Sequence, residues 1–337
     1  MNNFISFLLL SIILFSSCTG KPKENQPVEI SVHTIEGVKD IFIDAEEAQP
    51  LHLSEIAEKV TSITLQGNPR GIQYVLMTKN YLFFATARTV LQYDLSGRFI
   101  RRIDIGGWVT GYLAADADEK TLFVPVGNKI KSFDFLGNLK TEYSLQDNNF
   151  SLACLYHNGT LWILSGAFQE DRSIVYSISR IKLSTNEKTV LPFEKIDEPF
   201  FNSAGSLINT SAHCLFTLHN GEIIVSLASA NFLYRIRQDE VTPLVQWDIT
   251  PASTAIAERR PRASGFSGHY LFINYRRGQN FFIFLKNLYT GQQYNANDVV
   301  DDIFHTGANT TLRPLSGREG YFYFFRDVGE LFIVRLK

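Results

Sequence analysis

The side chains that could do chemistry are spread thinly along this chain of 337 residues. Three histidines, His157, His219 and His269, could bind a metal ion, but their separations match no zinc motif. The run from Asp116 to Glu119 has carboxylates typical of a calcium loop, without the glycine and terminal glutamate of such a loop. No G-x-S-x-G elbow and no Gly-rich phosphate loop occurs. The sequence therefore predicts no metal and no cofactor, and favours a binding protein over an enzyme.

A second group of candidate residues consists of arginines and one tryptophan. The guanidinium group of an arginine can bind a carboxylate through two parallel hydrogen bonds, and the faces of aromatic rings can pack against sugar rings. The alternative is that these arginines are solvated or pair with carboxylates close in the sequence, such as Glu170 and Asp327. On the first interpretation they bind a glycan or a small anion. The candidate ligand-binding residues are Arg88, Trp108, Arg172, Arg276, Arg277 and Arg326.

The N-terminus is typical of an export signal. Phe4 to Phe15 is an apolar stretch too short to cross a bilayer as a helix, and it is followed by Ser16-Ser17-Cys18. This ending is similar to a bacterial lipobox, which implies cleavage before Cys18 and acylation of that cysteine. We therefore expect a signal peptide at 1–17, a lipidated Cys18 with a polar tether to residue 50, and a folded body at 51–337. More than one acyl chain would hold the protein stably at a membrane.

The composition suits an all-β body. The chain has 27 Phe and 14 Tyr against only 2 Met, and aromatic side chains pack well on pleated sheets. The net charge of −2 provides no basic field that would bind nucleic acid. Besides Cys18, the cysteines are Cys154 and Cys214, too few for a disulfide framework. One bridge is possible, but we expect two buried free thiols.

One pattern recurs along the body: three strands separated by polar turns, preceded by a further apolar segment. In the first copy the three strands are Tyr81–Thr86, Val90–Asp94 and Phe99–Ile103. The pattern returns after roughly 40–50 residues, with one longer interval, which is the length of a four-stranded propeller blade. The three histidines fall at the same turn of this repeat, so we expect them to shape turns. Equivalent positions are Leu82, Leu122, Leu161, Ile223, Leu271 and Phe322.

The last copy is one strand short, because the chain ends soon after Phe332–Leu336. Upstream of the first copy, Val60–Leu65 is a strand with no blade of its own. Pairing this strand with the last blade removes an open sheet edge. We therefore predict an all-β, six-bladed β-propeller whose N-terminal strand closes the last blade. Ile41–Ile43 is expected to add a further short strand.

Three segments together resemble the six-bladed β-propeller lipoproteins of Bacteroidetes, which are related to NHL-repeat propellers. They are the lipobox-like Ser16-Ser17-Cys18, the lead-in Leu53–Ile56 with Val60–Leu65, and the blade motif Val90–Ile100. The resemblance covers nearly the whole mature chain and is strongest over 51–145. It implies an exported propeller anchored by lipid to a bacterial membrane, with the outer membrane as the expected location.

Loop length indicates where a ligand would bind. The long insertions all map to one face of the predicted propeller, and in repeat proteins such a face is often the binding face. We therefore expect a non-catalytic, lipid-anchored binding or scaffold propeller outside the cytoplasm, with a glycan or an anion as ligand. One alternative is an NHL-like lyase or hydrolase with its site in the central funnel. The other is a protein–protein interaction module at the outer membrane. The insertions are Ala167–Ser173, Glu194–Ser206, Thr250–Arg262 and Asn295–Thr311.

Overall fold

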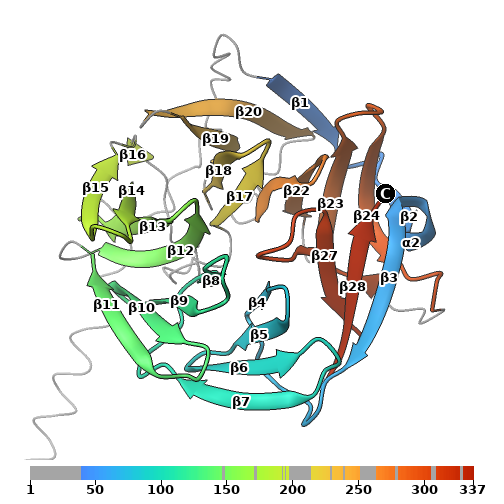
Figure 1. Cartoon of the computed structure of the whole chain (residues 1–337). Helices are drawn as coiled ribbons and strands as arrows, with labels where there is room; N and C mark the ends of the chain where they lie inside the picture. Colours follow the sequence, from blue (N-terminus) through green and yellow to red (C-terminus); the bar gives the residue numbers. More distant parts are fainter. Residues whose placement is uncertain are drawn as a thin grey trace, which may run out of the picture. The chain divides into compact units, whose positions relative to one another are not determined.

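The described residues form six sheets arranged as blades around a central axis (Figure 1). The predicted all-β, six-bladed β-propeller is therefore confirmed. Among the described residues, no helix is both long and apolar enough to cross a membrane. The computed structural model describes residues 39–337 except 146–148, 171–172, 192, 194, 197–213, 228–229, 238–239, 251–262, 278–279, 305–308 and 327–328.

Blades 1 to 3 are built from consecutive strands, with the innermost strand first in the chain. Blade 1 consists of β4 (Tyr74–Met77), β5 (Tyr81–Ala85), β6 (Thr89–Asp94) and β7 (Phe99–Asp104). Blade 2 consists of β8 (Ala114–Ala115), β9 (Thr121–Val126), β10 (Lys129–Asp134) and β11 (Leu139–Ser144). Blade 3 consists of β12 (Asn149–His157), β13 (Thr160–Phe168), β14 (Ile174–Lys182), β15 (Glu187–Leu191) and the short β16 (Lys195–Ile196).

Blades 4 to 6 follow the same plan but receive extra strands. Blade 4 consists of β17 (Leu215–His219), β18 (Glu222–Ser226), β19 (Phe232–Arg237) and β20 (Glu240–Thr250). Blade 5 consists of β21 (Ser264–Ser267), β22 (Tyr270–Arg277), β23 (Asn280–Asn287), β24 (Gln293–Val300) and the short β25 (Asn309–Thr310). Blade 6 takes only β26 (Arg313–Pro314), β27 (Tyr321–Phe325) and β28 (Glu330–Leu336) from the C-terminal end.

The N-terminal segment runs along the outside of the last three blades (Figure 1). β1 (Lys39–Asp44) pairs parallel with β20, and β2 (Gln49–His52) pairs parallel with β24. After the short helix α2 (Leu53–Ile56), β3 (Ala57–Thr64) pairs antiparallel with β28 as the outermost strand of blade 6. The predicted ring closure and the predicted strand at Ile41–Ile43 are both confirmed.

Local turn chemistry explains why the blades repeat. In blades 1 and 2 the last hairpin begins with Asp94 or Asp134, whose carboxylate accepts hydrogen bonds from backbone amides two and four residues later. In blade 3 the first hairpin turns through Asn158 and Gly159, both at positive φ (49° and 74°). Two successive positive φ values define the turn that matches the twist of paired strands.

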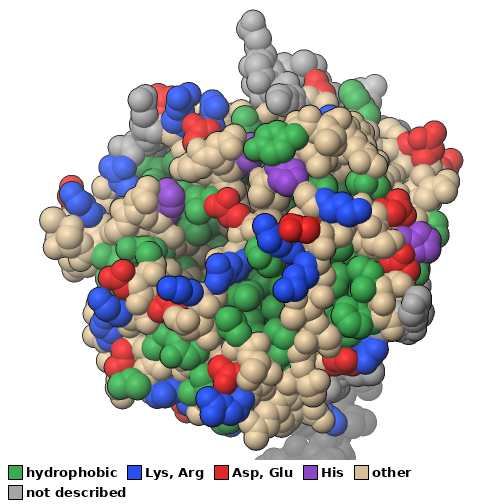
Figure 2. Space-filling model, turned by 45° about the vertical axis from the view of Figure 1, so that its right-hand side comes forward, with side chains coloured by type: hydrophobic (Ala, Val, Ile, Leu, Met, Phe, Trp, Pro, Cys, Tyr) green, Lys and Arg blue, Asp and Glu red, His purple; other side chains and the backbone are tan. Residues whose placement is uncertain are grey.

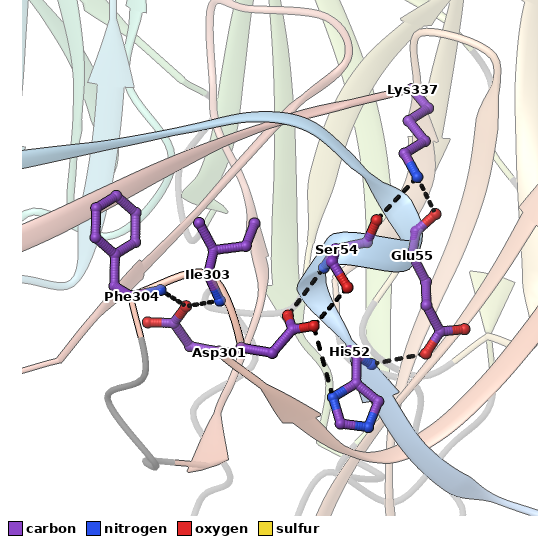
Figure 3. A network of polar contacts seen from close by, with 8 residues as sticks. His52, Ser54, Glu55, Asp301, Ile303, Phe304 and Lys337 are labelled. Atoms are coloured by element: carbon purple, nitrogen blue, oxygen red, sulfur yellow. Dashed lines mark hydrogen bonds and ion pairs between the residues drawn. The ribbon is translucent and has the colours of Figure 1, made fainter.

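A polar network joins the N-terminal segment to the C-terminus (Figure 3). Asp302, just after β24, accepts hydrogen bonds from the amide (3.0 Å) and the hydroxyl of Ser54. Lys337 Nζ donates to the carbonyl oxygens of Ser54 (2.8 Å) and Glu55 (3.0 Å). Burial alone would raise the pKa of Asp302, but the Ser54 donors and the nearby His52 ring outweigh it, so this pKa is lowered.

We expect Asp302→Asn to lower the free energy of unfolding by about 1 kcal/mol at pH 7, because a charge-assisted hydrogen bond becomes a neutral one. A carboxylate whose pKa is lower in the folded state stabilises the fold above its unfolded pKa of about 3.9. That contribution is lost as the pH falls through the lower folded pKa. Urea unfolding of both proteins across this range should show the difference vanish in acid, whereas a difference independent of pH would contradict the account.

Candidate functional site

The central channel has two mouths, and the strand directions determine which residues lie at each. The starts of the innermost strands and the loops between second and third strands share one mouth, the long-loop mouth. The turns between first and second strands surround the other, the turn-face mouth. In the described residues each mouth contains a cavity.

At the long-loop mouth two cavities adjoin, because they share residues such as Asn274 and Phe281. The cavity on the channel axis has a volume of about 130 Å³ and the outer one, on blade 5, about 240 Å³. We call the two together the mouth groove. Four of its nine polar side chains are amides, and Phe281 supplies an aromatic ring that is 39% exposed. The polar lining residues are Gln73, Tyr112, Asn274, Tyr275, Asn280, Asn297, Asp298, Thr311 and Arg313.

The axial end of the groove combines tyrosines with one arginine. The rings of Tyr74 and Tyr112 lie 4.9 Å apart between centroids. Burial and the neighbouring Tyr323 and Tyr74 raise the pKa of Tyr112, and the Arg313 guanidinium opposes this rise without cancelling it. Burial likewise raises the pKa of Tyr323. At neutral pH both phenols are therefore protonated. Arg313 makes no ion pair with any described carboxylate.

The structure places the arginines predicted from the sequence in separate local contacts. The Arg88 guanidinium lies 4.7 Å from the ring centroid of Trp108, and this tryptophan is 58% exposed. The Arg276 guanidinium lies 5.8 Å from the ring of Phe281, so it flanks the mouth groove. Arg326 Nε donates to the carboxylate of Glu330 at 2.8 Å, which is the paired state that the sequence left as an alternative.

One of the predicted ligand-binding residues and the lipidation site lie outside the described parts. Arg172 falls in the gap at 171–172, and Cys18 lies in the segment before residue 39. For Arg277 only the backbone, at the end of β22, is described.

The sequence reasoning missed Gln73, Asn274 and Arg313, which line the mouth groove. A signal was available for two of them. Gln73 directly precedes the innermost strand of blade 1, and Arg313 opens the innermost strand of blade 6. A polar residue at that position of the repeat lies where the strand enters the channel. Asn274 lies within β22 and carried no comparable signal.

At the turn-face mouth all six blades contribute to a cavity of about 390 Å³, the turn-face funnel. Its wall is part apolar and part polar, and the apolar part is formed by the ends of the innermost strands. Charged side chains surround this wall. Figure 2 likewise shows basic, acidic and hydrophobic side chains interleaved across the centre of the face it displays. The charged lining residues are Lys79, Asp116, Glu119, Arg318 and Glu319.

The histidines take part in turns and ring contacts. His157 Nε2 and His219 Nε2 each lie beside the amide nitrogen of the next asparagine, at 2.9 and 3.2 Å. His269 packs against Tyr289 with 5.0 Å between ring centroids. Within the described residues, no group of three or more His, Cys, Asp or Glu side chains is arranged to hold a metal ion. The turn role predicted for these histidines agrees with these contacts.

The two cysteines of the body are free and buried, as predicted. Burial raises the pKa of the Cys154 thiol, so it is protonated at neutral pH. Its sulfur lies 3.4 Å from the carbonyl oxygen of Tyr112, at the contact between blades 2 and 3. These features indicate a packing role.

No family model matches the chain, and no curated protein matches it in sequence. Solved structures are similar in fold. A Bacteroides fragilis protein described as exported is 12% identical, with a TM-score of 0.62 over 89% of this chain and 100% of that one. BamB from Moraxella catarrhalis is also 12% identical, with a TM-score of 0.48 over 83% and 99%. The β-propeller domain of Swd1 from Myceliophteria thermophila is 10% identical, with a TM-score of 0.48 over 82% and 100%. The chain has a β-propeller fold.

Proposed function

We propose that this chain is an exported, lipid-anchored β-propeller of the Bacteroidetes lipoprotein type, and that it binds an acidic glycan in the mouth groove outside the cytoplasm. The observation that carries this proposal is the combination of groups in the groove. Several side-chain amides and an exposed aromatic ring lie beside Arg313, which lacks a described carboxylate partner. Amides and aromatic rings suit sugar hydroxyls and ring faces, and arginine suits a carboxylate.

The state of the tyrosines favours binding over catalysis. A general base works best with a pKa near the operating pH. The pKa of Tyr112 is raised by burial, so its hydroxyl stays protonated at neutral pH, where it can donate a hydrogen bond but cannot act as a base. Asp298, in the outer part of the groove, has a pKa raised by burial, and this feature taken alone would suit a general acid. We favour binding over a lyase or hydrolase because the protonated Tyr112 at the axial end of the groove supplies no base.

The exposed pair of Arg88 and Trp108 offers a second contact for a longer ligand. Both residues belong to long-loop connections: Arg88 to the loop between β5 and β6, and Trp108 to the link between blades 1 and 2. The guanidinium stacked on the indole holds the ring in place while leaving it 58% exposed. Such a ring can stack against a sugar at the rim.

We expect Arg313→Gln to weaken binding of a uronic-acid oligosaccharide at least 10-fold, since a hydrogen bond to a charged group contributes about 1.5–3 kcal/mol. Calorimetric titration of the soluble body should also show weaker binding as salt is added. The matched control is Arg98→Gln, which removes an arginine paired with Asp94 in a turn outside the groove. Equal affinity for the neutral oligosaccharide of the same length, or an unchanged affinity in Arg313→Gln, would count against the proposal.

The lipid anchor is tested separately. Because Ser16-Ser17-Cys18 follows an apolar stretch, we expect a clickable palmitate analogue to label the protein in cells through Cys18. Cys18→Ala should abolish the label, whereas Cys154→Ala, which removes a buried thiol of the body, should retain it. Equal labelling of the wild type and Cys18→Ala would show that the protein is not anchored through this residue.

A further inference from the structure

The turn-face funnel lies at the opposite end of the channel from the mouth groove and contains a cation that the fold does not neutralise. Arg318 lies in the first turn of blade 6, and its Nη2 donates to the carbonyl oxygen of Thr78 at 3.1 Å. Its Nε is buried without a hydrogen-bond partner. Arg318 makes no ion pair with any described carboxylate. A half-buried guanidinium with so few partners is costly, and an anion would stabilise it.

Two of the three acidic side chains that line the funnel, Asp116 and Glu119, already accept hydrogen bonds from the turns around them. Asp116 Oδ1 accepts from the amides of Lys120 (2.6 Å) and Thr121 (3.0 Å) within its own turn. Glu119 accepts from the backbone amide of Asn80 (2.9 Å) and from its side-chain amide, which ties blade 2 to blade 1. These bonds orient both carboxylates toward backbone and amide donors.

A second cation lies on the same side of the funnel. Lys79 follows the innermost strand of blade 1, next to Thr78, whose carbonyl oxygen binds Arg318. Its ammonium group makes no ion pair with a described residue. Arg318 and Lys79 therefore both line the cavity without a described counter-charge.

One part of the funnel wall is suited to an apolar chain. Leu215, Phe216 and Phe266 are buried, and Leu155 and Leu218 are half-buried, at the ends of innermost strands that line the cavity. The volume of about 390 Å³ is within the range of small-molecule sites, which begins at roughly 300 Å³. The cavity therefore matches a small molecule with an apolar body and an anionic end.

We propose that the turn-face funnel is a second binding site, for a small organic carboxylate with an apolar chain, in which Arg318 and Lys79 hold the carboxylate and the innermost-strand ends hold the chain. This site is independent of the glycan site proposed for the mouth groove. It lies at the other end of the channel, and of the described lining residues it shares only Pro314 with the mouth groove.

Octanoate is a suitable probe, with octanol and acetate as probes that lack the charge or the chain. Calorimetric titration of the soluble body should show that octanoate binds at least 10-fold more tightly than either. Arg318→Gln should weaken octanoate binding at least 10-fold and Lys79→Gln a few-fold, while Arg335→Gln, whose arginine pairs with Glu58 on the outer strand, should leave it unchanged. The conservative Arg318→Lys, which keeps the charge, should retain part of the affinity.

The outcomes separate the two sites. Arg313→Gln should leave octanoate binding intact, and Arg318→Gln should leave binding of the acidic oligosaccharide intact. Equal affinity for octanol and octanoate would overturn the proposed carboxylate site. Octanoate binding that is the same in Arg318→Gln and in Lys79→Gln as in the wild type would also overturn it. If Arg318→Gln does not fold, the comparison of Lys79→Gln with the wild type decides the matter, because Lys79 is exposed on the rim.

Discussion

A chain that begins at residue 70 should not form a cooperatively folded ring, whereas a chain that begins at residue 39 should. The deletion removes β3 and exposes the hydrogen-bonding edge of β28 along Glu330–Leu336. It also removes side chains packed in the core, namely Leu53, Ile56, Ala57, Ile63 and Leu65, each at most 8% exposed.

The expected loss is as large as the whole stability of a typical domain. Burial of a large aliphatic side chain contributes about 1.5–3 kcal/mol, so four of these side chains together contribute roughly 6–12 kcal/mol. Native domains are stable by only about 5–15 kcal/mol. Thermal unfolding followed by circular dichroism should therefore show a broad transition or none for the shorter chain.

A chain that begins at residue 53 separates the contributions of the N-terminal strands. It keeps α2 and β3 but lacks β1 and β2, which pair along the outer edges of blades 4 and 5. It should fold with an intermediate midpoint, because the ring is still closed. Identical midpoints for chains beginning at residues 39 and 70 would mean that β3 does not close the ring.

Gly111→Ala should destabilise the protein by about 3 kcal/mol, the upper part of the usual range for overpacking. A Cβ atom at Gly111 would lie 1.9 Å from the carbonyl oxygen and 2.4 Å from the carbonyl carbon of Leu152. The obstacle is backbone of the innermost strand of blade 3, so no side-chain rotation relieves it. The neighbouring Tyr112 forms an isolated parallel β-bridge with Ala153, and its carbonyl oxygen accepts a hydrogen bond from the amide of Cys154. Blades 2 and 3 would therefore have to move apart.

Gly159→Ala is the matched control. A Cβ there would meet no atom within 4 Å, but the residue has a φ of +74°. Only the backbone strain of an alanine in the left-handed region is added, which costs about 1 kcal/mol. Chemical denaturation should rank wild type above Gly159→Ala and Gly159→Ala above Gly111→Ala. Equal stability of the two variants would show that blades 2 and 3 accommodate the extra methyl group.

The strands of the first blade could be predicted closely from the sequence, because their signals are local. Tyr81–Thr86, Val90–Asp94 and Phe99–Ile103 agree with β5, β6 and β7 to within one residue at each end. Polar turns separate these strands, and the Asp94 turn is built from hydrogen bonds spanning two to four residues. Ring closure was predictable for a different reason. The last repeat lacks one strand, and the strand at Val60–Leu65 belongs to no repeat. This spare strand can therefore supply the missing strand of the last blade.

The parallel pairing of β1 with β20 and of β2 with β24 could not be predicted from the sequence. Ile41–Ile43 indicated a strand, but nothing local indicates that it lies on blade 4, about 200 residues later in the chain. Such pairing depends on which outer edges the ring leaves open. The same holds for Asp302, whose partner Ser54 is 248 residues away.

By itself the sequence determined the blade repeat, the number of blades and the strand that closes the ring. It favoured free thiols at Cys154 and Cys214 but left a bridge between them possible, and the structure shows both to be free. Only the tertiary structure decided which polar side chains meet. Arg88, Arg276 and Arg326 belong to one face by their place in the repeat, yet each makes its own contact, with Trp108, Phe281 or Glu330. Arg313 is the first residue of the innermost strand β26 and Arg318 lies in the turn after it, so the two arginines line cavities at opposite mouths of the channel. The physical reason is that the position of a residue in the repeat determines on which face of the propeller it lies. How far its side chain lies from the axis, and whether its charge is paired, depend on how the six blades pack around that axis.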